Sequence, residues 1–487
     1  MRDLARTERR TTSAPQEAAL FPLRESPDSR QAVSRPTLRL ARRGFRDHGR
    51  LQAGRAHRLI VCFLAGLVFG GEQRAPSQTV PAIPPRGTDA LVASPEPGWP
   101  QWRGPCRDGI SAETGLLESW PEGGPPLLWR FDGLGTGWSS PIVVGERVYI
   151  TGDLDDDLVV FALNTAGRLE WRTSNGRAWN GSYPGARACC ALSDGRLYHL
   201  NAHGRLACLD PETGRELWTT RILERFQGKN ITWALSECLL IDGERVIVTP
   251  GGRSGLMAAL DKRTGATVWT TPPLDDDRTS HSSPILFRFG RRRLIAQCSS
   301  AHGFGVDADS GRLLWTVPLE NRYGVNTSTP VYGSGCVFYV TPYAENGRLY
   351  RLRPTPRGID AVRVWTNELD TVTGSGVLLG DTFFAAGYRK NKWWLAVDWR
   401  SGEFRHELKD FTTGAAVYAD GRLYVLDESG AAGLLKPGDE GLGTAGRFQL
   451  VRRERRIRDA WAHPVLCDAR LYLRYHDTLW CFDVRDR

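Results

Sequence analysis

The stretch ACLDPETGRELW (207–218) contains the unit that decides the fold: an apolar strand, an Asp, a polar turn ending in Gly, and a Trp soon after. Three close copies follow the same pattern: FALNTAGRLEW (161–171), AALDKRTGATVW (258–269) and GVDADSGRLLW (305–315). Three weaker copies are RLRPTPRGIDAVRVW (351–365), AVDWRSGEFRHEL (396–408) and LLKPGDEGLGTAGRFQL (434–450). A repeat of this kind predicts an array of equivalent structural units.

The spacing of the copies predicts the architecture. Successive positions at the end of the unit are 42 to 51 residues apart, which is the length of a four-stranded propeller blade. The last copy, WCFDVRDR (480–487), stops before its Trp, whereas LLWRF (127–131) supplies Trp129 ahead of the first complete copy. We therefore expect an all-β, eight-bladed β-propeller of four-stranded antiparallel blades, closed by pairing of the N- and C-terminal strands.

The Trp of each copy is expected to lie as a wedge between neighbouring blades. A buried indole covers on the order of 200 Å², or roughly 5 kcal/mol before entropy is subtracted. The predicted docking residues are Trp129, Trp171, Trp218, Trp269, Trp315 and Trp365. Leu408 and Leu450 take this place in the weaker copies, where we expect the weakest contacts between blades.

The repeat closely resembles the quinoprotein type, found in quinoprotein alcohol dehydrogenases and in the propeller lipoprotein of the bacterial outer-membrane-protein assembly machine. The resemblance covers residues 127–487, and CLDPETGRELW is nearly ideal. The segment 99–129 is also similar to the N-terminal lead of exported bacterial proteins with a quinone-binding-like propeller. The resemblance implies a PQQ-like propeller but not one particular activity.

The region before the repeat divides by composition. Residues 1–58 hold 14 Arg and 6 acidic residues and form a basic leader, whereas the rest of the chain is nearly neutral, which argues against nucleic-acid binding. Residues 59–71 begin with the apolar run Leu59–Gly70 and predict a signal peptide or membrane segment. Residues 72–98 predict a Pro/Ser-rich linker, and residues 99–126 a strap leading into the propeller. We expect an exported protein of the periplasm or cell envelope, with at most peripheral or N-terminally tethered membrane association.

The adjacent cysteines Cys189 and Cys190 fall in two columns of the inner strands. One column reads Pro141, Cys190, Cys238, Pro284, Pro330, Gly376, Ala416 and Pro464. The preceding column reads Ser140, Cys189, Glu237, Ser283, Thr329, Ser375, Ala415 and His463. Since small side chains fit where eight strands crowd an axis, packing explains the pair, and a vicinal disulfide against a quinone is the alternative.

The same columns predict a ligand site at the mouth of the central channel. Polar and aromatic residues interrupt or flank the small ones, and such a mixture on a concave wall is typical of ligand sites. The candidates are Trp138, Arg187, Trp233, Glu237, His281, Asn326, Trp461 and His463. The alternative is a solvated funnel in which Glu237 faces Arg187.

Common catalytic and metal motifs are missing from the sequence. It has no Cys-x-x-Cys, Gly-x-Ser-x-Gly or His-Glu-x-x-His, and LDDDL (154–158) and LDDDR (274–278) lack the spacing of a calcium loop, so solvated turns are expected there. The dehydrogenase resemblance implies PQQ held with calcium by a Glu and an Asn, a catalytic Asp, a tryptophan floor and a cysteine ring. No residue of this chain matches these roles one by one. Glu237, Asn326 and Trp233 are the nearest candidates by their position at the funnel, and no catalytic residue, metal site or cofactor is assigned.

Three functions remain open. The favoured one is a non-catalytic binding or assembly scaffold at the cell envelope, whose partner is another envelope protein. The second is a PQQ-dependent dehydrogenase that oxidises alcohols or sugars, and the third is a propeller that binds a small ligand or carbohydrate.

Overall fold

The computed structural model describes residues 89–487 except 345, 439–440, 452–456 and 487, all within the unit Pro76–Arg487. The predicted leader (1–58) and the signal or membrane segment (59–71) lie outside the described residues. In the described part of the chain, no helix has the length and apolar character needed to cross a membrane.

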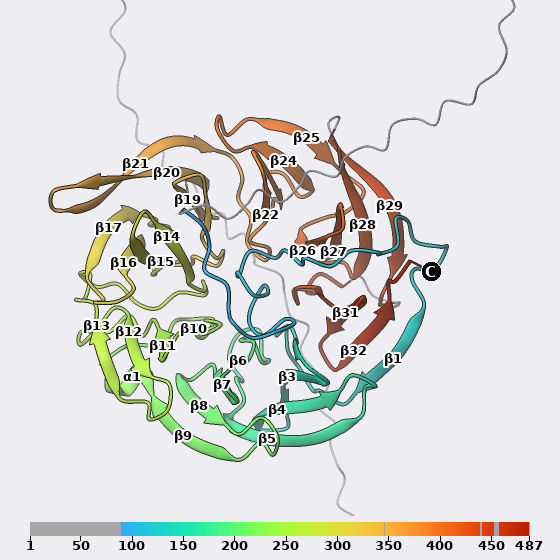
Figure 1. Cartoon of the computed structure of the whole chain (residues 1–487), viewed down its shortest axis with the longest axis horizontal. Coiled ribbons are helices and arrows are strands. Elements are labelled where there is room, and N and C mark those ends of the chain that lie inside the picture. The colour runs from blue at the N-terminus through green and yellow to red at the C-terminus, as the bar shows by residue number, and fades with distance from the viewer. Residues whose placement is uncertain (1–88, 345, 439–440, 452–456, 487) are drawn as a thin grey trace, which may run out of the picture. The chain divides into compact units, whose positions relative to one another are not determined.

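The described strands form eight four-stranded antiparallel sheets that surround a common axis (Figure 1). This confirms the predicted eight-bladed propeller. Blade 1 comprises β2 (Ile142–Val144), β3 (Arg147–Leu154), β4 (Asp157–Asn164) and β5 (Leu169–Arg177), and blade 2 comprises β6 (Ala191–Ser193), β7 (Arg196–Leu200), β8 (Arg205–Leu209) and β9 (Glu216–Arg221). Blade 3 comprises β10 (Leu240–Asp242), β11 (Arg245–Val248), β12 (Ala258–Asp261) and β13 (Thr267–Thr270), and blade 4 comprises β14 (Ile285–Phe289), β15 (Arg292–Cys298), β16 (His302–Asp307) and β17 (Leu313–Pro318). A short helix, α1 (Ile222–Arg225), follows β9.

Blades 5 to 8 complete the circle. Blade 5 comprises β18 (Val331–Gly333), β19 (Cys336–Thr341), β20 (Asn346–Thr355) and β21 (Gly358–Asn367), and blade 6 comprises β22 (Val377–Leu379), β23 (Thr382–Ala386), β24 (Trp394–Asp398) and β25 (Phe404–Leu408). Blade 7 comprises β26 (Gly414–Ala419), β27 (Arg422–Asp427), β28 (Ala431–Gly438) and β29 (Gly441–Gln449), and blade 8 comprises β30 (Val465–Cys467), β31 (Arg470–Tyr475), β32 (Thr478–Asp483) and β1 (Leu127–Asp132).

The ring closes as predicted, because β1 is the outer strand of the last blade. It pairs antiparallel with β32, and Trp129 lies opposite Cys481. A buried arginine of β31 strengthens the seam between blades 8 and 1: Arg474 donates hydrogen bonds to the carbonyl oxygens of Ser139 (2.9 Å) and Thr151 (2.6 Å). The two ends of the propeller are thus joined through both main-chain and side-chain contacts.

The Asp and Gly of the repeat shape the turn between the third and fourth strands. Asp261 accepts hydrogen bonds from the N–H groups of Arg263 (3.0 Å) and Thr264 (2.8 Å) and from the Thr264 hydroxyl (2.8 Å). These bonds hold the pKa of Asp261 below its usual value. Gly265 adopts φ +72°, and a Cβ there would lie 2.9 Å from the ring of Trp218. Glycine is therefore required both by the backbone and by the indole of the preceding blade.

Each wedge indole also makes a directional bond across a blade boundary. Trp129, Trp171, Trp218, Trp269 and Trp365 donate Nε1–H to main-chain carbonyls of the following blade, those of Thr165, Pro211, Lys262, Ala308 and Trp399. Trp315 differs, because blade 5 has a longer outer hairpin, and it donates to the Tyr339 hydroxyl instead (3.2 Å). Most wedges thus combine buried area with a satisfied indole N–H.

The two weak copies dock differently from the sequence expectation. The residue of blade 6 paired like the other wedges is His406, opposite Ala396, and not Leu408. In blade 7 that position is Gly446 and not Leu450. A Cβ on Gly446 would lie 2.5 Å from Trp120, which comes from the segment before β1 and packs between blades 7 and 8. Blade 7 therefore borrows an indole that its own repeat lacks.

Residues 89–126, which we call the strap from here on, cross the ring near its centre (Figure 1). The contacts of the strap therefore begin within the stretch predicted to be a linker. It bonds to all eight blades, through Trp99 to Val143, Pro100 to Leu192, Arg107 to Leu239, Val92 to Leu286, Trp102 to Thr329, Arg103 to Gly376, Ser111 to Tyr418 and Leu117 to Val484.

The strap lies on the face that carries the hairpin turns between first and second strands. Asp89 accepts a hydrogen bond from the N–H of Gly290 in blade 4 (2.7 Å), and Glu113 from those of Asp468 and Ala469 in blade 8 (2.7 and 2.6 Å). We call this the strap face. Because the strands are antiparallel, the loops between blades and the turns between second and third strands emerge at the opposite face, the loop face.

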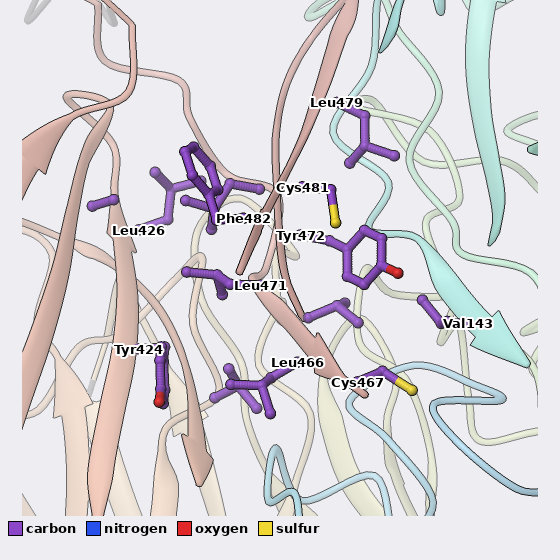
Figure 2. Packing of buried hydrophobic residues seen from close by; sticks show 14 of the residues in the cluster. Val143, Tyr424, Leu426, Leu466, Cys467, Leu471, Tyr472, Leu479, Cys481 and Phe482 are labelled. Atoms are coloured by element: carbon purple, nitrogen blue, oxygen red, sulfur yellow. The ribbon is translucent and has the colours of Figure 1, made fainter. Parts of the chain in front are cut away.

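The apolar core lies between blades. Figure 2 shows one cluster in which Tyr424 and Leu426 of blade 7 lie beside Leu471 and Phe482 of blade 8. The same cluster reaches Val143 of blade 1 and includes Trp99 and Trp120 of the strap. The strap is therefore part of the core.

Candidate functional site

The channel is filled by the strap at one end. The guanidinium of Arg107 donates to the carbonyl oxygens of Pro284 (2.6 Å), Leu239 (2.8 Å) and Cys238 (2.8 Å), and burial lowers its pKa to about 10. Arg103, equally buried, donates to the carbonyl of Gly376. A cavity of about 60 Å³ remains beside these arginines, bordered by blades 4 to 6, and holds a few water molecules at most.

Hydroxyl groups next to the axis link one blade to the next. Ser283 accepts a hydrogen bond from the N–H of Cys238 (2.9 Å), Ser375 from Thr329 (3.0 Å), and Ser140 from His463 (2.8 Å). The small polar residues of the inner column therefore satisfy main-chain groups that no neighbouring strand pairs.

Glu237 does not face Arg187. Its carboxylate is fully buried and accepts hydrogen bonds from the N–H and the hydroxyl of Thr249, both at 2.8 Å. Gln297 of blade 4 lies 3.4 Å from the same carboxylate. Burial raises the pKa of Glu237 to about 7, and the hydrogen bonds from Thr249 partly oppose this shift. The residue connects blades 3 and 4 below the mouth of the channel.

His463 and Asn326 are also engaged within the structure. His463 Nε2 lies 2.7 Å from the carbonyl oxygen of Thr373, and its ring is 4.3 Å from that of Trp102 of the strap. Burial and nearby Arg103 lower the pKa of His463 to about 3. The Asn326 amide donates to three main-chain carbonyls, those of Ser299, Ser300 and Leu319. Both side chains hold loops in place.

Four candidates do come together at the loop face. Trp138 and Trp461 have ring centroids 5.2 Å apart, and Arg187 lies 5.2 Å from the Trp138 ring. Arg187 also donates to the carbonyl oxygen of Trp233 (3.1 Å) and to those of Gly185, Ser182 and Tyr183. Burial lowers the pKa of Arg187 to about 10. This guanidinium fixes the loop that carries Tyr183.

His281 lies near this group and is half-buried. Its ring Nδ1 is 3.2 Å from the Ser236 hydroxyl, and its main-chain N–H donates to the carbonyl of Asn326 (3.1 Å). Burial, followed by the charge of Arg187, lowers the pKa of His281 to about 3. A neutral imidazole in this position supports the wall of the mouth.

Aromatic side chains that the repeat did not indicate extend this group around the mouth. Tyr183 packs on Trp461 (5.5 Å), while Tyr323 packs on Trp233 (6.4 Å) and on Tyr343 (5.0 Å). Tyr388 follows at 6.2 Å from Tyr343, and after burial the nearby Tyr388 also raises the pKa of Tyr183. We call this set the aromatic rim: Trp138, Trp179, Tyr183, Trp233, Tyr323, Tyr343, Tyr388 and Trp461, each half-buried. All its members lie in loops between blades or in turns between second and third strands.

The backbone at Tyr183 is unusual for a bulky residue. Its φ is +52°, in the left-handed region that residues other than glycine rarely adopt. The hydrogen bonds from Arg187 to the neighbouring carbonyls hold this conformation. The arrangement directs an aromatic side chain toward Trp461 at the mouth.

The cysteines form no redox pair with each other. Cys189 and Cys190 are free thiols, and all nine cysteines in the described part of the chain are buried. Burial raises the pKa of both thiols. The main-chain N–H of Cys189 donates to the sulfur of Cys238 on the next blade (3.2 Å), as expected for packed inner-strand residues.

The acidic motifs differ from each other. Asp155 to Asp157 are exposed in the turn between β3 and β4. Asp277, in contrast, is buried: it accepts from the Ser299 hydroxyl, and one of its oxygens lies 2.9 Å from His302 Nδ1. LDDDR thus holds a loop together and is more than a solvated turn. Among residues 89–487 outside the gaps, no group of three or more His, Cys, Asp or Glu is placed to hold a metal.

The side chains nominated for PQQ and calcium do not fit that group. The Glu237 carboxylate already accepts hydrogen bonds from Thr249, and the Asn326 amide already donates to three main-chain carbonyls. The strap fills the channel next to them, and the thiols of Cys189 and Cys190 are not joined. No catalytic step through a quinone follows from these residues.

Comparisons with known proteins identify the family of the chain. The family model described as outer membrane protein assembly factor BamB matches residues 155–405. BamB of Yersinia pestis is 21% identical over 327 residues, which cover 63% of this chain and 78% of that protein. A lanthanide-dependent methanol dehydrogenase of Methylacidiphilum fumariolicum is 27% identical over 158 residues, or 29% of this chain and 24% of that enzyme. The chain thus matches about a quarter of the dehydrogenase.

One solved structure, that of a designed protein, has the same fold. The designed protein Ika8 superimposes with a TM-score of 0.51 at 10% identity, covering 74% of this chain and 100% of that one. BamB from Moraxella catarrhalis gives a TM-score of 0.47 at 17% identity, over 69% and 94% of the two chains. Because the family model matches more than half of the sequence, the chain belongs to the PQQ-like β-propeller family described as outer membrane protein assembly factor BamB, and it is related to the quinoprotein dehydrogenases.

Proposed function

We propose that the protein is a non-catalytic binding scaffold of the cell envelope, and that its partner, another envelope protein, docks on the aromatic rim. The observation that carries this proposal is the set of half-buried aromatic side chains in mutual contact at the loop face. Beneath it, the polar candidates are engaged within the fold, and the strap occupies the far end of the channel. A ligand at the mouth therefore meets a surface for contact and no catalytic centre.

The composition of the rim suits protein recognition. Tyr and Trp give large contact areas with few rotatable bonds and are enriched where binding energy concentrates. Arg187 and Tyr183 are held before any ligand arrives, which reduces the entropy lost on binding. Arg322 and Arg389 lie over Tyr323 and Tyr343 at the edge, where they offer polar contacts.

Two further observations support the assignment to the envelope. The Yersinia pestis relative is named as an outer membrane protein assembly factor and is covered over most of its length. The apolar run Leu59–Gly70 follows Arg55 and Arg58, as in export signals.

Site-specific photocrosslinking tests the proposal. A photoreactive phenylalanine analogue replaces Tyr388 or Trp233, two rim residues from different loops, and the full chain is irradiated in an envelope extract. Val268, half-exposed on the outer strand β13, serves as the matched control position. We expect the same discrete protein adduct from both rim positions and none from Val268. Adducts of equal yield from all three positions, or no rim adduct, would contradict the proposal.

A titration with PQQ and calcium separates the scaffold from the dehydrogenase. Since Glu237 and Asn326 are engaged, we expect the absorption spectrum of the quinone to stay unchanged on addition of the protein. A spectral shift accompanied by dye reduction with alcohols would instead establish the enzyme.

A further inference from the structure

One sector of the strap face is rich in exposed arginines. The arginine patch consists of Arg288, Arg291, Arg292, Arg312, Arg351, Arg353 and Arg357, all exposed. They lie at the turn between β14 and β15, at the turn between β16 and β17, and on the hairpin of β20 and β21. Among the described residues here, Asp307 and Asp360 of these segments and Asp89 of the strap have no ion pair with an arginine. The patch therefore holds seven positive and three negative charges.

The three segments form one continuous surface. The Tyr332 hydroxyl donates to the carbonyl of Arg288 (3.4 Å), and a Cβ on nearby Gly335 would lie 3.7 Å from Phe289. The N–H of Leu352, between Arg351 and Arg353, donates to the carbonyl of Gly335 (3.0 Å). A Cβ on Gly358 would lie 3.9 Å from the Arg312 guanidinium.

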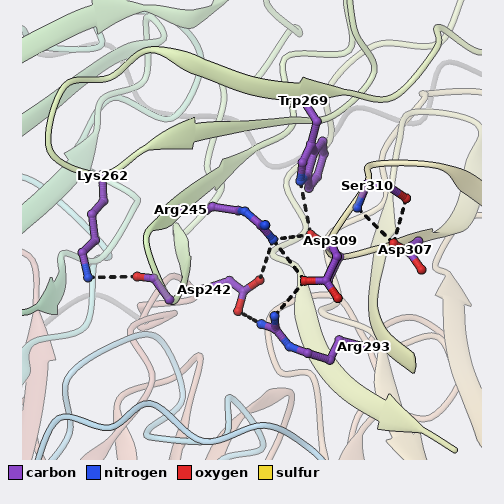
Figure 3. Close-up of polar contacts among 10 residues, drawn as sticks. Asp242, Arg245, Lys262, Trp269, Arg293, Asp307, Asp309 and Ser310 are labelled. Carbon is purple, nitrogen blue, oxygen red and sulfur yellow. Dashed lines mark hydrogen bonds and ion pairs between the residues drawn. The ribbon is translucent and has the colours of Figure 1, made fainter. Parts of the chain in front are cut away.

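Two arginines near the patch, Arg245 of blade 3 and Arg293 of blade 4, are neutralised by carboxylates, whereas the patch arginines are not. Figure 3 shows Arg245 and Arg293 sharing Asp242 and Asp309, with N–O distances of 3.2 and 2.9 Å to Asp309. For the patch arginines, in contrast, no ion pair with any described residue is seen. Unpaired positive charge at this density remains available to an anionic partner.

Apolar side chains accompany the charges. On the hairpin, Val362 lies directly opposite Arg351 and is 38% exposed, and Val364 is 41% exposed. A basic surface with a few exposed aliphatic groups matches the headgroup region of a bilayer better than it matches a purely polar partner.

The path of the chain also points to a membrane. The strap begins beside the patch, since Asp89 contacts Gly290 and the carbonyl of Ala90 accepts from the N–H of Arg288 (2.7 Å). The apolar run Leu59–Gly70 lies only 19 residues earlier in the sequence. If that segment enters a bilayer during export, the described chain reaches the propeller first at Asp89 and Ala90, and both contact the patch.

We propose that the arginine patch docks the propeller onto an anionic phospholipid surface, with the strap face toward the membrane. The aromatic rim on the opposite face then points away from the lipid. Each arginine near an anionic surface strengthens binding about five-fold, and the effect is screened by salt within roughly 8 Å at physiological ionic strength.

Hydrogen exchange of the full chain with lipid vesicles tests the proposal. The probes are vesicles of phosphatidylethanolamine with 30% phosphatidylglycerol, compared with phosphatidylcholine alone. We expect protection at residues 286–294 and 350–364 with the anionic vesicles only. Protection confined to the loop face, or none in these segments while the chain binds the vesicles, would overturn the proposal.

Matched charge variants make the test independent of the basic leader. The patch variant carries Arg291→Gln, Arg292→Gln, Arg353→Gln and Arg357→Gln. The control carries Arg168→Gln, Arg172→Gln, Arg177→Gln and Arg215→Gln, four exposed arginines of blades 1 and 2. We expect the patch variant to bind anionic vesicles on the order of 100-fold more weakly than the control. Equal affinities, or capture of an acidic protein with no vesicle protection, would refute the lipid assignment.

Discussion

Glu237 is a carboxyl group held inside the ring, where burial raises its pKa to about 7 from an ordinary value of 4.5. The folded protein therefore binds this proton more tightly than the unfolded chain does. The stabilisation linked to Glu237 is fully present below pH 4.5 and is lost as the pH rises to 7. A shift of this size corresponds to about 3 kcal/mol.

Replacing Glu237 by Gln should remove this dependence. Between pH 5 and pH 8, we expect the unfolding free energy of the native chain to fall by about 2 kcal/mol more than that of the variant. The reason is that the Gln side chain of the variant cannot ionise. Urea unfolding at both pH values measures it, and Glu122→Gln, at an exposed position of the strap, is the control. An unchanged pH profile would show that Glu237 is not linked to folding.

Single residues were predictable as positions in a repeat but not as contacts. Glu237 and His463 lie just before the inner strands β10 and β30, and their partners Thr249, Trp102 and Thr373 come from other parts of the chain. The alignment of copies fixes where along a blade a residue lies. The alignment does not show which group from another part of the chain contacts that buried residue.

Among the elements, the strap depends most on buried arginines. Arg107→Met would leave the carbonyls of Pro284, Leu239 and Cys238 without a donor. Since each unsatisfied buried group costs about 1 to 3 kcal/mol, we expect a loss of at least about 3 kcal/mol in unfolding free energy. Urea titration measures it, and Arg168→Met at the surface should change stability by less than 1 kcal/mol. Equal effects of the two substitutions would mean that the strap adds little.

The indole that the strap supplies to blade 7 leads to a second prediction for this element. Trp120→Ala should cost about 3 to 5 kcal/mol, as for a wedge within a blade, because Gly446 leaves no side chain to fill the space. Hydrogen exchange should rise at Gly446–Gln449 of β29. If exchange rises only in the strap, Trp120 does not stabilise blade 7.

The path of the strap lay beyond sequence reasoning, as did every rim member except Trp138, Trp233 and Trp461. Both belong to segments outside the repeat, so no periodicity constrains them. The rim residues Tyr183, Tyr343 and Tyr388 come from loops of different length in different blades, and only closure of the ring brings them together. Trp179 and Tyr183, in the non-repeating AWNGSYPG (178–185), were the available signal.

At the scale of the whole molecule, the ring has one seam made from the two ends of the described chain. Trp129→Ala and Trp218→Ala remove equivalent wedges, but β1 reaches its blade only through pairing with β32. We expect hydrogen exchange at Leu479–Phe482 to rise more in the first variant than exchange at Leu206–Leu209 in the second. Similar increases would indicate that the seam is as cooperative as any other blade.

The seam also sets the order in which this chain can finish folding. Asp132 and Thr478, which meet across it, are 346 positions apart. A ribosome makes β1 long before β32, its hydrogen-bonding partner, so β1 and the apolar Leu127 and Leu128 in it must wait unpaired. Contacts this distant form slowly. Newly made chains are therefore most prone to aggregate while β32 has not yet been made, and a chaperone that shields β1 would help more than one acting on any inner blade.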